Sequence, residues 1–116
     1  MQVNEIITYL IGMVNANTKS MRWADEIRLR TQPQKAQEVK ELLLETAALA
    51  SRNEQPQSSL VYSHYSAPGG FSLILVWDTA VVPTLGSDTA LLILEGLKPL
   101  GLLDHTVMIE QWRSEK

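Results

Sequence analysis

The sequence predicts one α+β domain with an antiparallel sheet, the element order β-α-β-β-α-β and an extra helix at its N-terminus. The hydrophobic period switches repeatedly between about two and about 3.6 residues, as it does where strands and helices alternate. A turn signal at residues 67–70 joins two strand-like segments, and the second of these is apolar on both faces. The chain of 116 residues has the size of a single domain. We assign residues 1–20 to the N-terminal helix and linker and residues 21–116 to the domain.

The N-terminal segment, residues 3–14, predicts an amphipathic helix. Its apolar residues follow the i, i+3, i+4, i+7 spacing of one helical stripe: Val3, Ile6, Ile7, Leu10, Ile11 and Val14. No Lys or Arg precedes the segment and polar residues interrupt it, so neither a signal peptide nor a membrane span is expected. We therefore expect a cytoplasmic protein with no membrane partner, whose stripe docks on its own domain or on a partner subunit.

The first strand is predicted from the alternation in residues 21–31. One face carries Trp23, Asp25, Ile27 and Leu29, and the other, wetter face carries Ala24, Glu26, Arg28 and Arg30. Pro33 stands in the favoured first turn of a helix, and the apolar spacing continues to about Arg52. A long helix therefore follows the strand.

The hairpin that comes next holds the most informative strand of the sequence. Residues 60–66 and 71–78 are rich in strand-forming side chains. The centre of the second strand, residues 73–76, is apolar at every position, which is typical of a strand covered on both faces. The helices can cover one face, so a partner subunit or the N-terminal helix is expected to cover the other.

The last third of the chain predicts a loop, a helix and a strand. Ser87 is a good N-cap and Asp88 suits the positive end of a helix dipole. Pro99 and Gly101 end that helix, and residues 105–112 form the last strand. The complete order is that of the ferredoxin-like, split β-α-β arrangement.

The strand of residues 71–78 also carries a resemblance to a known family. It ends in Trp77-Asp78, and it resembles the third strand of the dimeric α+β barrel proteins that include antibiotic-biosynthesis monooxygenases. The resemblance implies that two protomers pair sheet to sheet, close a barrel with helices outside, and bind a phenolic or quinol-like substrate in its pocket without a cofactor. Haem-degrading members carry an Asn before this Trp and a His in the second helix. This chain has neither, which disfavours haem breakdown and leaves Trp77 as the one residue that the resemblance transfers.

The candidate catalytic residues are His64 and Trp77, and the candidate substrate-binding residues are Tyr62, Tyr65, Arg28 and Trp23. Period-two geometry places Tyr62 and His64 on one face of their strand and Tyr65 on the other. Imidazole titrates near neutral pH, so His64 could take a proton from a phenol. The alternative is a half-buried sheet face whose polar tips are hydrogen-bonded or wet.

Three further features each leave two interpretations. Trp23, Trp77 and Trp112 lie on three predicted strands and could surround a flat ligand or pack the core and an interface. Arg28 would bind an anionic group if its face lines the barrel, and would otherwise lie on a solvated edge. His105 stands at the very start of the last predicted strand, next to a turn, where a local hydrogen bond is favoured over a role as a base.

Composition excludes several other classes of function. The net charge is −3 and there is no basic block, so nucleic-acid binding is not expected. The chain has no cysteine, and its two histidines lie too far apart in sequence to form a helical metal motif.

Taken with the resemblance, these observations lead us to expect a homodimeric, cofactor-independent monooxygenase-like protein that acts on a small aromatic molecule. The alternatives are a non-catalytic small-molecule-binding domain and an oligomerisation domain of the same fold.

Overall fold

A computed structural model describes residues 4–5, 20–53 and 56–114 of the chain. The predicted N-terminal helix lies outside the described residues, except for Asn4 and Glu5, which are helical. The assignment of residues 1–20 to a separate segment therefore stays a prediction.

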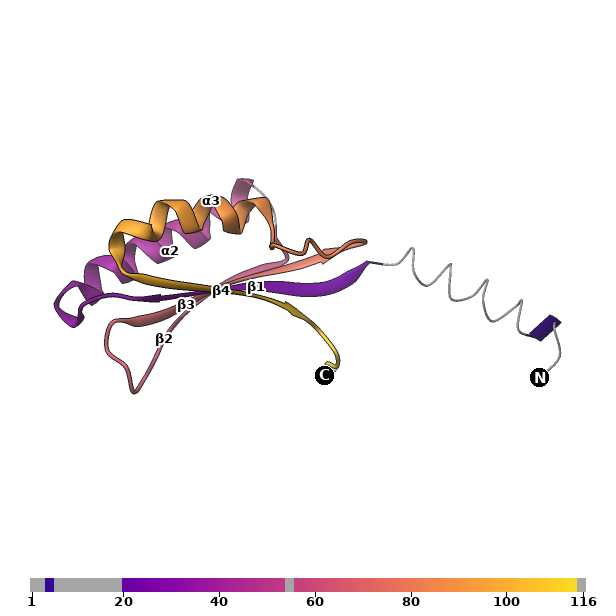
Figure 1. The fold of residues 1–116 in the computed structure, drawn as a ribbon, viewed down its shortest axis with the longest axis horizontal. Coiled ribbons are helices and arrows are strands. Elements are labelled where there is room, and N and C mark those ends of the chain that lie inside the picture. Colours follow the sequence, from indigo (N-terminus) through magenta and orange to yellow (C-terminus); the bar gives the residue numbers. More distant parts are fainter. Residues whose placement is uncertain (1–3, 6–19, 54–55, 115–116) are drawn as a thin grey trace.

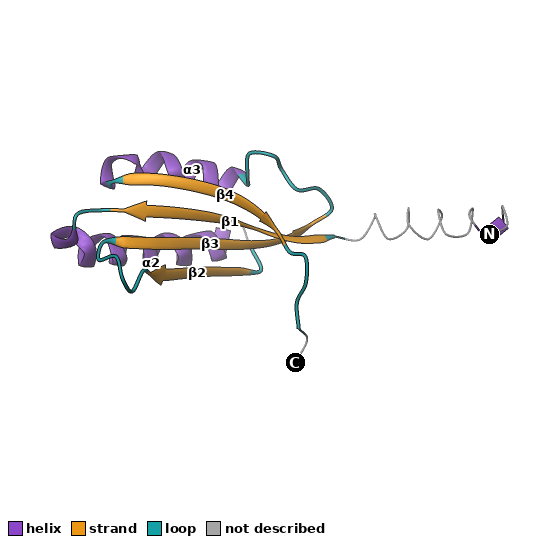
Figure 2. Cartoon of the chain, turned by 60° about the horizontal axis from the view of Figure 1, so that its bottom comes forward, coloured by secondary structure: helices purple, strands orange, loops and turns teal. Residues whose placement is uncertain are grey.

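The described part of the chain forms a four-stranded antiparallel sheet with the order β2-β3-β1-β4 (Figure 2). The strands are β1 (Met21–Arg30), β2 (Ser58–Ser63), β3 (Gly70–Thr79) and β4 (Leu102–Ile109). The chain order and the spatial order together are those of the ferredoxin-like arrangement, so the predicted fold class is confirmed.

Both helices pack on the same face of this sheet (Figure 1). A short 3-10 turn, η1 (Pro33–Lys35), leads into α2 (Ala36–Asn53), and α3 (Asp88–Leu97) is followed by η2 (Lys98–Leu100). Ser87 caps α3 as predicted, because its Oγ accepts a hydrogen bond from the backbone N of Ala90 at 3.0 Å.

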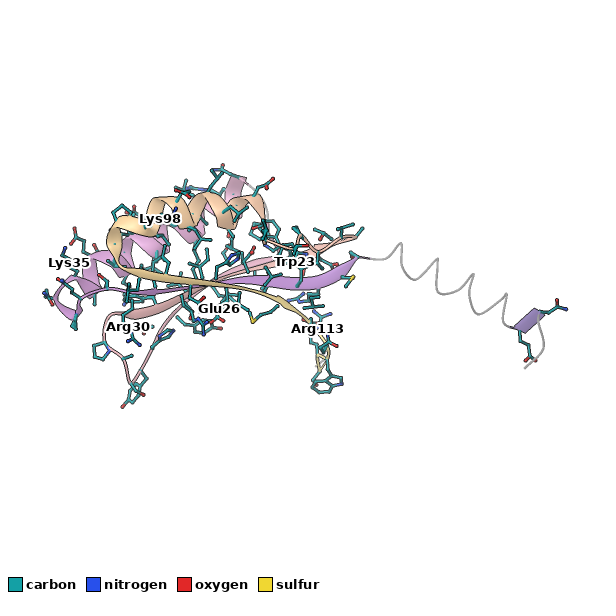
Figure 3. The ribbon with its side chains drawn as sticks, viewed as in Figure 1. Trp23, Glu26, Arg30, Lys35, Lys98 and Arg113 are labelled. Carbon is teal, nitrogen blue, oxygen red and sulfur yellow. The ribbon has the colours of Figure 1, made fainter. Side chains whose placement is uncertain are left out.

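The hydrophobic core lies between the sheet and the helices. The predicted alternation of β1 is confirmed, since Trp23, Asp25, Ile27 and Leu29 are all buried on the face toward the helices. The other face of the sheet, which we call the open face, carries Glu26 and Arg30, which project away from the helices (Figure 3). Within residues 20–53 and 56–114 no helix or loop packs on the open face, so this face of the sheet is left uncovered.

Two predicted strands have different limits in the structure. The last strand is Leu102–Ile109 rather than 105–112, because its pairing with β1 begins at Leu102, directly after the turn at Gly101. His105 is therefore in the middle of a strand, and Trp112 lies in the C-terminal tail with 82% of its surface exposed. The strand predicted at 60–66 is Ser58–Ser63, because the chain already turns after residue 63 toward Gly69, whose φ is +88°.

Candidate functional site

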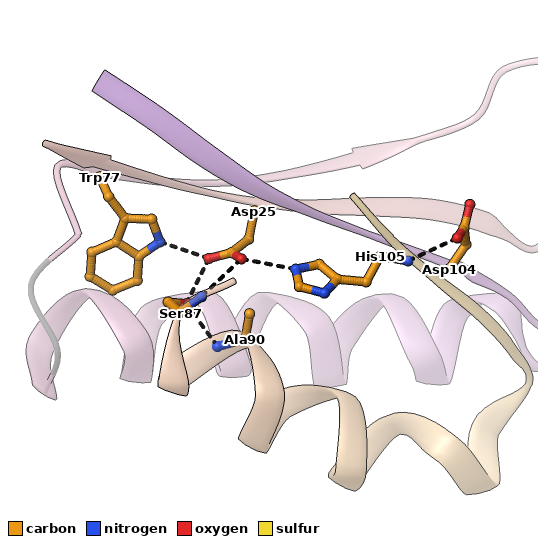
Figure 4. Close-up of polar contacts among 6 residues, drawn as sticks. All are labelled: Asp25, Trp77, Ser87, Ala90, Asp104 and His105. Atoms are coloured by element: carbon orange, nitrogen blue, oxygen red, sulfur yellow. Dashed lines mark hydrogen bonds and ion pairs between the residues drawn. The ribbon is translucent and has the colours of Figure 1, made fainter. Parts of the chain in front are cut away.

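A buried carboxylate, Asp25, is the centre of the polar interactions beneath the helices (Figure 4). Its side chain is 0% exposed. Its Oδ2 accepts hydrogen bonds from Trp77 Nε1 at 2.8 Å and from Ser87 Oγ at 2.6 Å. Its Oδ1 lies 2.9 Å from His105 Nε2 and accepts from the backbone N of Ser87 at 3.2 Å. Burying a charge is costly unless it is well hydrogen-bonded, and four partners meet that requirement.

The sheet register explains why these side chains meet. β1 is central, with β3 on one side and β4 on the other. Asp25 faces the helices from β1. Trp77 faces them from β3, two residues after Leu75, which is the partner of Asp25 in the sheet. His105 faces them from β4, where it is paired with Ile27. Ser87 is the N-cap residue directly before α3. One carboxylate therefore connects three strands to the start of a helix.

The hydrogen bonds assign the protons of the cluster. An indole N–H and a backbone N–H can only donate, and Ser87 Oγ already accepts from Ala90, so its own proton points to Asp25. The carboxylate is thus an acceptor at both oxygens, which is its ionised form. His105 must then carry a proton on Nε2, and in the neutral ring Nδ1 holds the lone pair.

The Nδ1 atom of His105 is the part of the cluster that has no hydrogen-bond partner among the described residues. The His105 side chain as a whole is 15% exposed. A histidine whose one nitrogen is held by a carboxylate and whose other nitrogen is unpaired has the geometry of an oriented general base.

Gly86 closes the cluster from the loop before α3. Its φ is +92°, a conformation that L side chains rarely adopt. A Cβ at this position would lie 2.4 Å from His105 Cε1 and 2.5 Å from Asp25 Oδ1. Glycine is therefore required here for its backbone conformation and for the room that it leaves to the His105 ring.

An aromatic pair adjoins the carboxylate. The rings of Trp23 and Trp77 stack with their centroids 6.0 Å apart and their planes at 25°. Trp23 Nε1 donates to Thr79 Oγ1 at 2.8 Å, while Trp77 Nε1 donates to Asp25. Both indoles are thus fixed in orientation, and the stacked pair lies near the Asp25–His105 pair, with Trp23 itself buried.

A second polar cluster lies on the open face. His64 Nε2 is 2.9 Å from Ser72 Oγ, which donates to Glu26 Oε2 at 3.1 Å. Beside them Arg28 forms an ion pair with Asp104. A groove of about 440 Å³ runs past this cluster, lined by Arg28, Leu29, Arg30, His64, Gly70, Leu102, Leu103 and Asp104.

Comparison with known proteins identifies the fold. The sequence matches no protein-family model and no curated protein. A Deinococcus radiodurans structure, provisionally assigned as an antibiotic biosynthesis monooxygenase, has a TM-score of 0.61 and 21% identity, over 81% of this chain and 96% of its own. The Mycobacterium tuberculosis protein Rv0793 also has a TM-score of 0.61, with 16% identity over 81% of this chain and 99% of its own. The chain has the antibiotic biosynthesis monooxygenase fold. The predicted resemblance is confirmed at the level of the fold.

Within this monooxygenase-type fold, the residues predicted from the sequence fall into two groups. Trp23 and Trp77 lie together beneath the helices. His64 and Arg28 line the groove on the open face, and Tyr62 pairs with Ser72 beside them. In one protomer His64 and Trp77 are therefore separated by the sheet and cannot act on the same substrate atom.

Tyr65 and Trp112 are distant from both groups. Tyr65 is fully exposed in the turn after β2, and Trp112 is in the tail after β4. Neither side chain contributes to a cluster within the described residues.

The sequence analysis did not single out Asp25, and for His105 it favoured a local hydrogen bond over a role as a base. The available signal was Asp25 itself, a single carboxylate on a strand face otherwise made of Trp23, Ile27 and Leu29. A charge at such a position needs buried donors.

Metal and membrane binding were also assessed. In residues 4–5, 20–53 and 56–114, no three or more His, Asp or Glu side chains are grouped so that they could hold a metal ion. No helix of the same residues is long and apolar enough to cross a bilayer.

Proposed function

We propose that this protein is a cofactor-independent, monooxygenase-like enzyme that oxidises a small phenolic molecule at His105, next to Trp77. One observation carries the proposal: the carboxylate of Asp25 holds both His105 Nε2 and Trp77 Nε1, and His105 Nδ1 has no partner among the described residues. An oriented base beside the indole of Trp77 suits the deprotonation of a phenol. The fold supports the same class of activity, since a protein with this fold is provisionally assigned to it.

The chemistry requires only the phenol, molecular oxygen and a base. His105 Nδ1 takes the phenolic proton, and the electron-rich phenolate transfers electrons to oxygen as a ring C–O bond forms. The resulting peroxide is protonated by the imidazolium. Loss of the proton on the same ring carbon, together with cleavage of the O–O bond, releases water and leaves a quinone. One oxygen atom enters the product and the other enters water, so the four electrons that the phenol loses reduce both oxygen atoms and the oxidation balances without a metal or a flavin.

Oxygen uptake tests this proposal. The purified protein, treated with a metal chelator, is incubated with a set of phenols and quinols, and oxygen consumption is compared with quinone formation. We expect at least one compound to be oxidised with equal amounts of oxygen consumed and quinone formed. Ligands that raise the Tm of the protein and are never transformed would contradict the enzyme proposal and favour a non-catalytic binding domain.

The open face is proposed to pair with a second copy of the chain. Leu60 and Met108 are exposed there, and Ile74 and Val76 are only partly covered, so pairing would bury apolar surface. In this arrangement His64, Tyr62 and Arg28 lie in the interface and the groove that they line becomes enclosed.

Light scattering tests the dimer. We expect a dimer at micromolar concentration and a monomer for Ile74→Arg, because the added charge lies at the centre of the open face and can pair with the opposite Glu26 in the monomer. Leu44→Arg, on an exposed position of α2, serves as the matched control and should remain dimeric. A monomeric parent protein would contradict the proposed interface.

A further inference from the structure

A second groove lies at the end of the domain where β1 ends and β4 begins, and we call it the end groove. Arg30, the last residue of β1, pairs with Leu102, the first residue of β4. η1 follows this pair in one segment and η2 precedes it in the other. The end groove has a volume of about 410 Å³ and lies between these two segments. It is lined by Arg30, Gln32 and Lys35 on one side and by Pro99, Leu100 and Leu102 on the other.

The lining of the end groove contains two positive charges and no negative charge. Both cations, Arg30 and Lys35, are exposed at the same end of the domain (Figure 3). Neither side chain forms an ion pair in the described part of the chain, although Glu38 follows Lys35 on the next turn. Arg28 and Lys98, by contrast, are each paired with a carboxylate. Unpaired cations along one hollow favour the binding of an anion.

The donors of the end groove suit a carboxylate. The planar guanidinium of Arg30 presents paired N–H donors that match the two oxygens of a carboxylate group. Thr31 also lines the groove and is 6% exposed. Its Oγ1 is the only buried side-chain polar atom among the described residues that has no hydrogen-bond partner. Buried polar groups are normally paired, and a bound oxygen acceptor would supply the partner that this hydroxyl lacks.

The other side of the end groove is apolar. Leu102 is 76% exposed, and Pro99 and Leu100 precede it in η2. An inorganic anion would leave these side chains in water, whereas an apolar group attached to the anion would cover them. We infer that the end groove binds a small organic acid, whose carboxylate is held by Arg30 and Lys35 and whose apolar part packs on Leu102. All of the lining comes from one chain, so this site depends neither on the proposed dimer nor on the proposed enzymatic activity.

Titration of the full chain with benzoate, followed by nitrogen-15 NMR, tests the inference. Benzamide has the same ring without the charge, and acetate has the charge without the ring. At pH 7 and low ionic strength we expect benzoate to shift the amide signals of residues 30–35 and 100–102, with a Kd at least about fivefold lower than that of either control. No saturable shift, an equal Kd for benzoate and a control, or shifts centred on Trp77 and His105 would overturn the inference.

Two variants that each remove one positive charge locate the site. Arg30→Gln should raise the Kd for benzoate at least about fivefold, because the amide has neither the charge nor the fork of donors. Lys40→Gln removes a charge from an exposed position of α2 outside the end groove and should leave the Kd within about twofold. The Tm of both variants should stay close to that of the parent protein, because both side chains are exposed. Equal Kd values for the two variants would contradict the site.

Discussion

Replacing Asp25 with asparagine lowers the free energy of unfolding by about 3 kcal/mol, the largest effect on stability that we expect from an isosteric change in this protein. The amide keeps the shape of the carboxylate but turns one acceptor oxygen into an NH₂ group. All four partners of Asp25 are donors, so two of them would face another donor in a site that is 0% exposed. Each buried donor left without an acceptor costs about 1–3 kcal/mol. Urea denaturation of the variant measures the loss.

The matched control for this variant is Asp104→Asn. Asp104 is exposed and its ion pair with Arg28 is on the open face, so the loss should be below about 1 kcal/mol. An Asp25→Asn loss as small as that of Asp104→Asn would show that the buried cluster contributes little to the stability of the fold.

His105→Gln should reduce the rate of phenol oxidation by at least about 100-fold, the usual lower limit for loss of a general base. Glutamine can still donate to Asp25 Oδ1 from its amide, so the cluster should stay folded, but glutamine cannot take up a proton at neutral pH. The measurement is kcat from oxygen uptake, with the Tm recorded for the same sample to show that the fold is retained.

His64→Gln is the comparison that locates the reaction. His64 bonds to Ser72 on the open face, on the other side of the sheet from Trp77. Its replacement should leave kcat within about twofold of the parent protein as long as the protein remains dimeric. A large loss for His64→Gln with full activity for His105→Gln would move the active site to the open face.

The element order of the fold could be predicted from local signals. The alternation from Trp23 to Leu29, the turn before Gly70 and the cap at Ser87 each depend on a few neighbouring residues, and all three are confirmed. Local signals specify local structure, and the ferredoxin-like arrangement is one of few ways in which such elements can share a core.

The site was harder to predict because it depends on pairing between distant segments. His105 reaches Asp25 only because β4 begins at Leu102, which fixes His105 opposite Ile27 with its side chain toward the helices. The sequence alone placed the start of that strand three residues later. Period-two counting within one strand likewise could not show that His64 and Trp77 face opposite sides, because this depends on the register between β2 and β3.

The tautomer of His105 tests the central claim most directly, since the proposed base exists only if Asp25 holds the proton on Nε2. Nitrogen-15 NMR of the imidazole ring distinguishes the two neutral tautomers when spectra are recorded at about pH 9, well above the usual range of histidine titration. We predict that the His105 ring is protonated at Nε2 with an unprotonated Nδ1, and that this preference is weakened in Asp25→Asn. A ring protonated at Nδ1, or a tautomer unaffected by Asp25→Asn, would contradict the proposed role of Asp25 and His105.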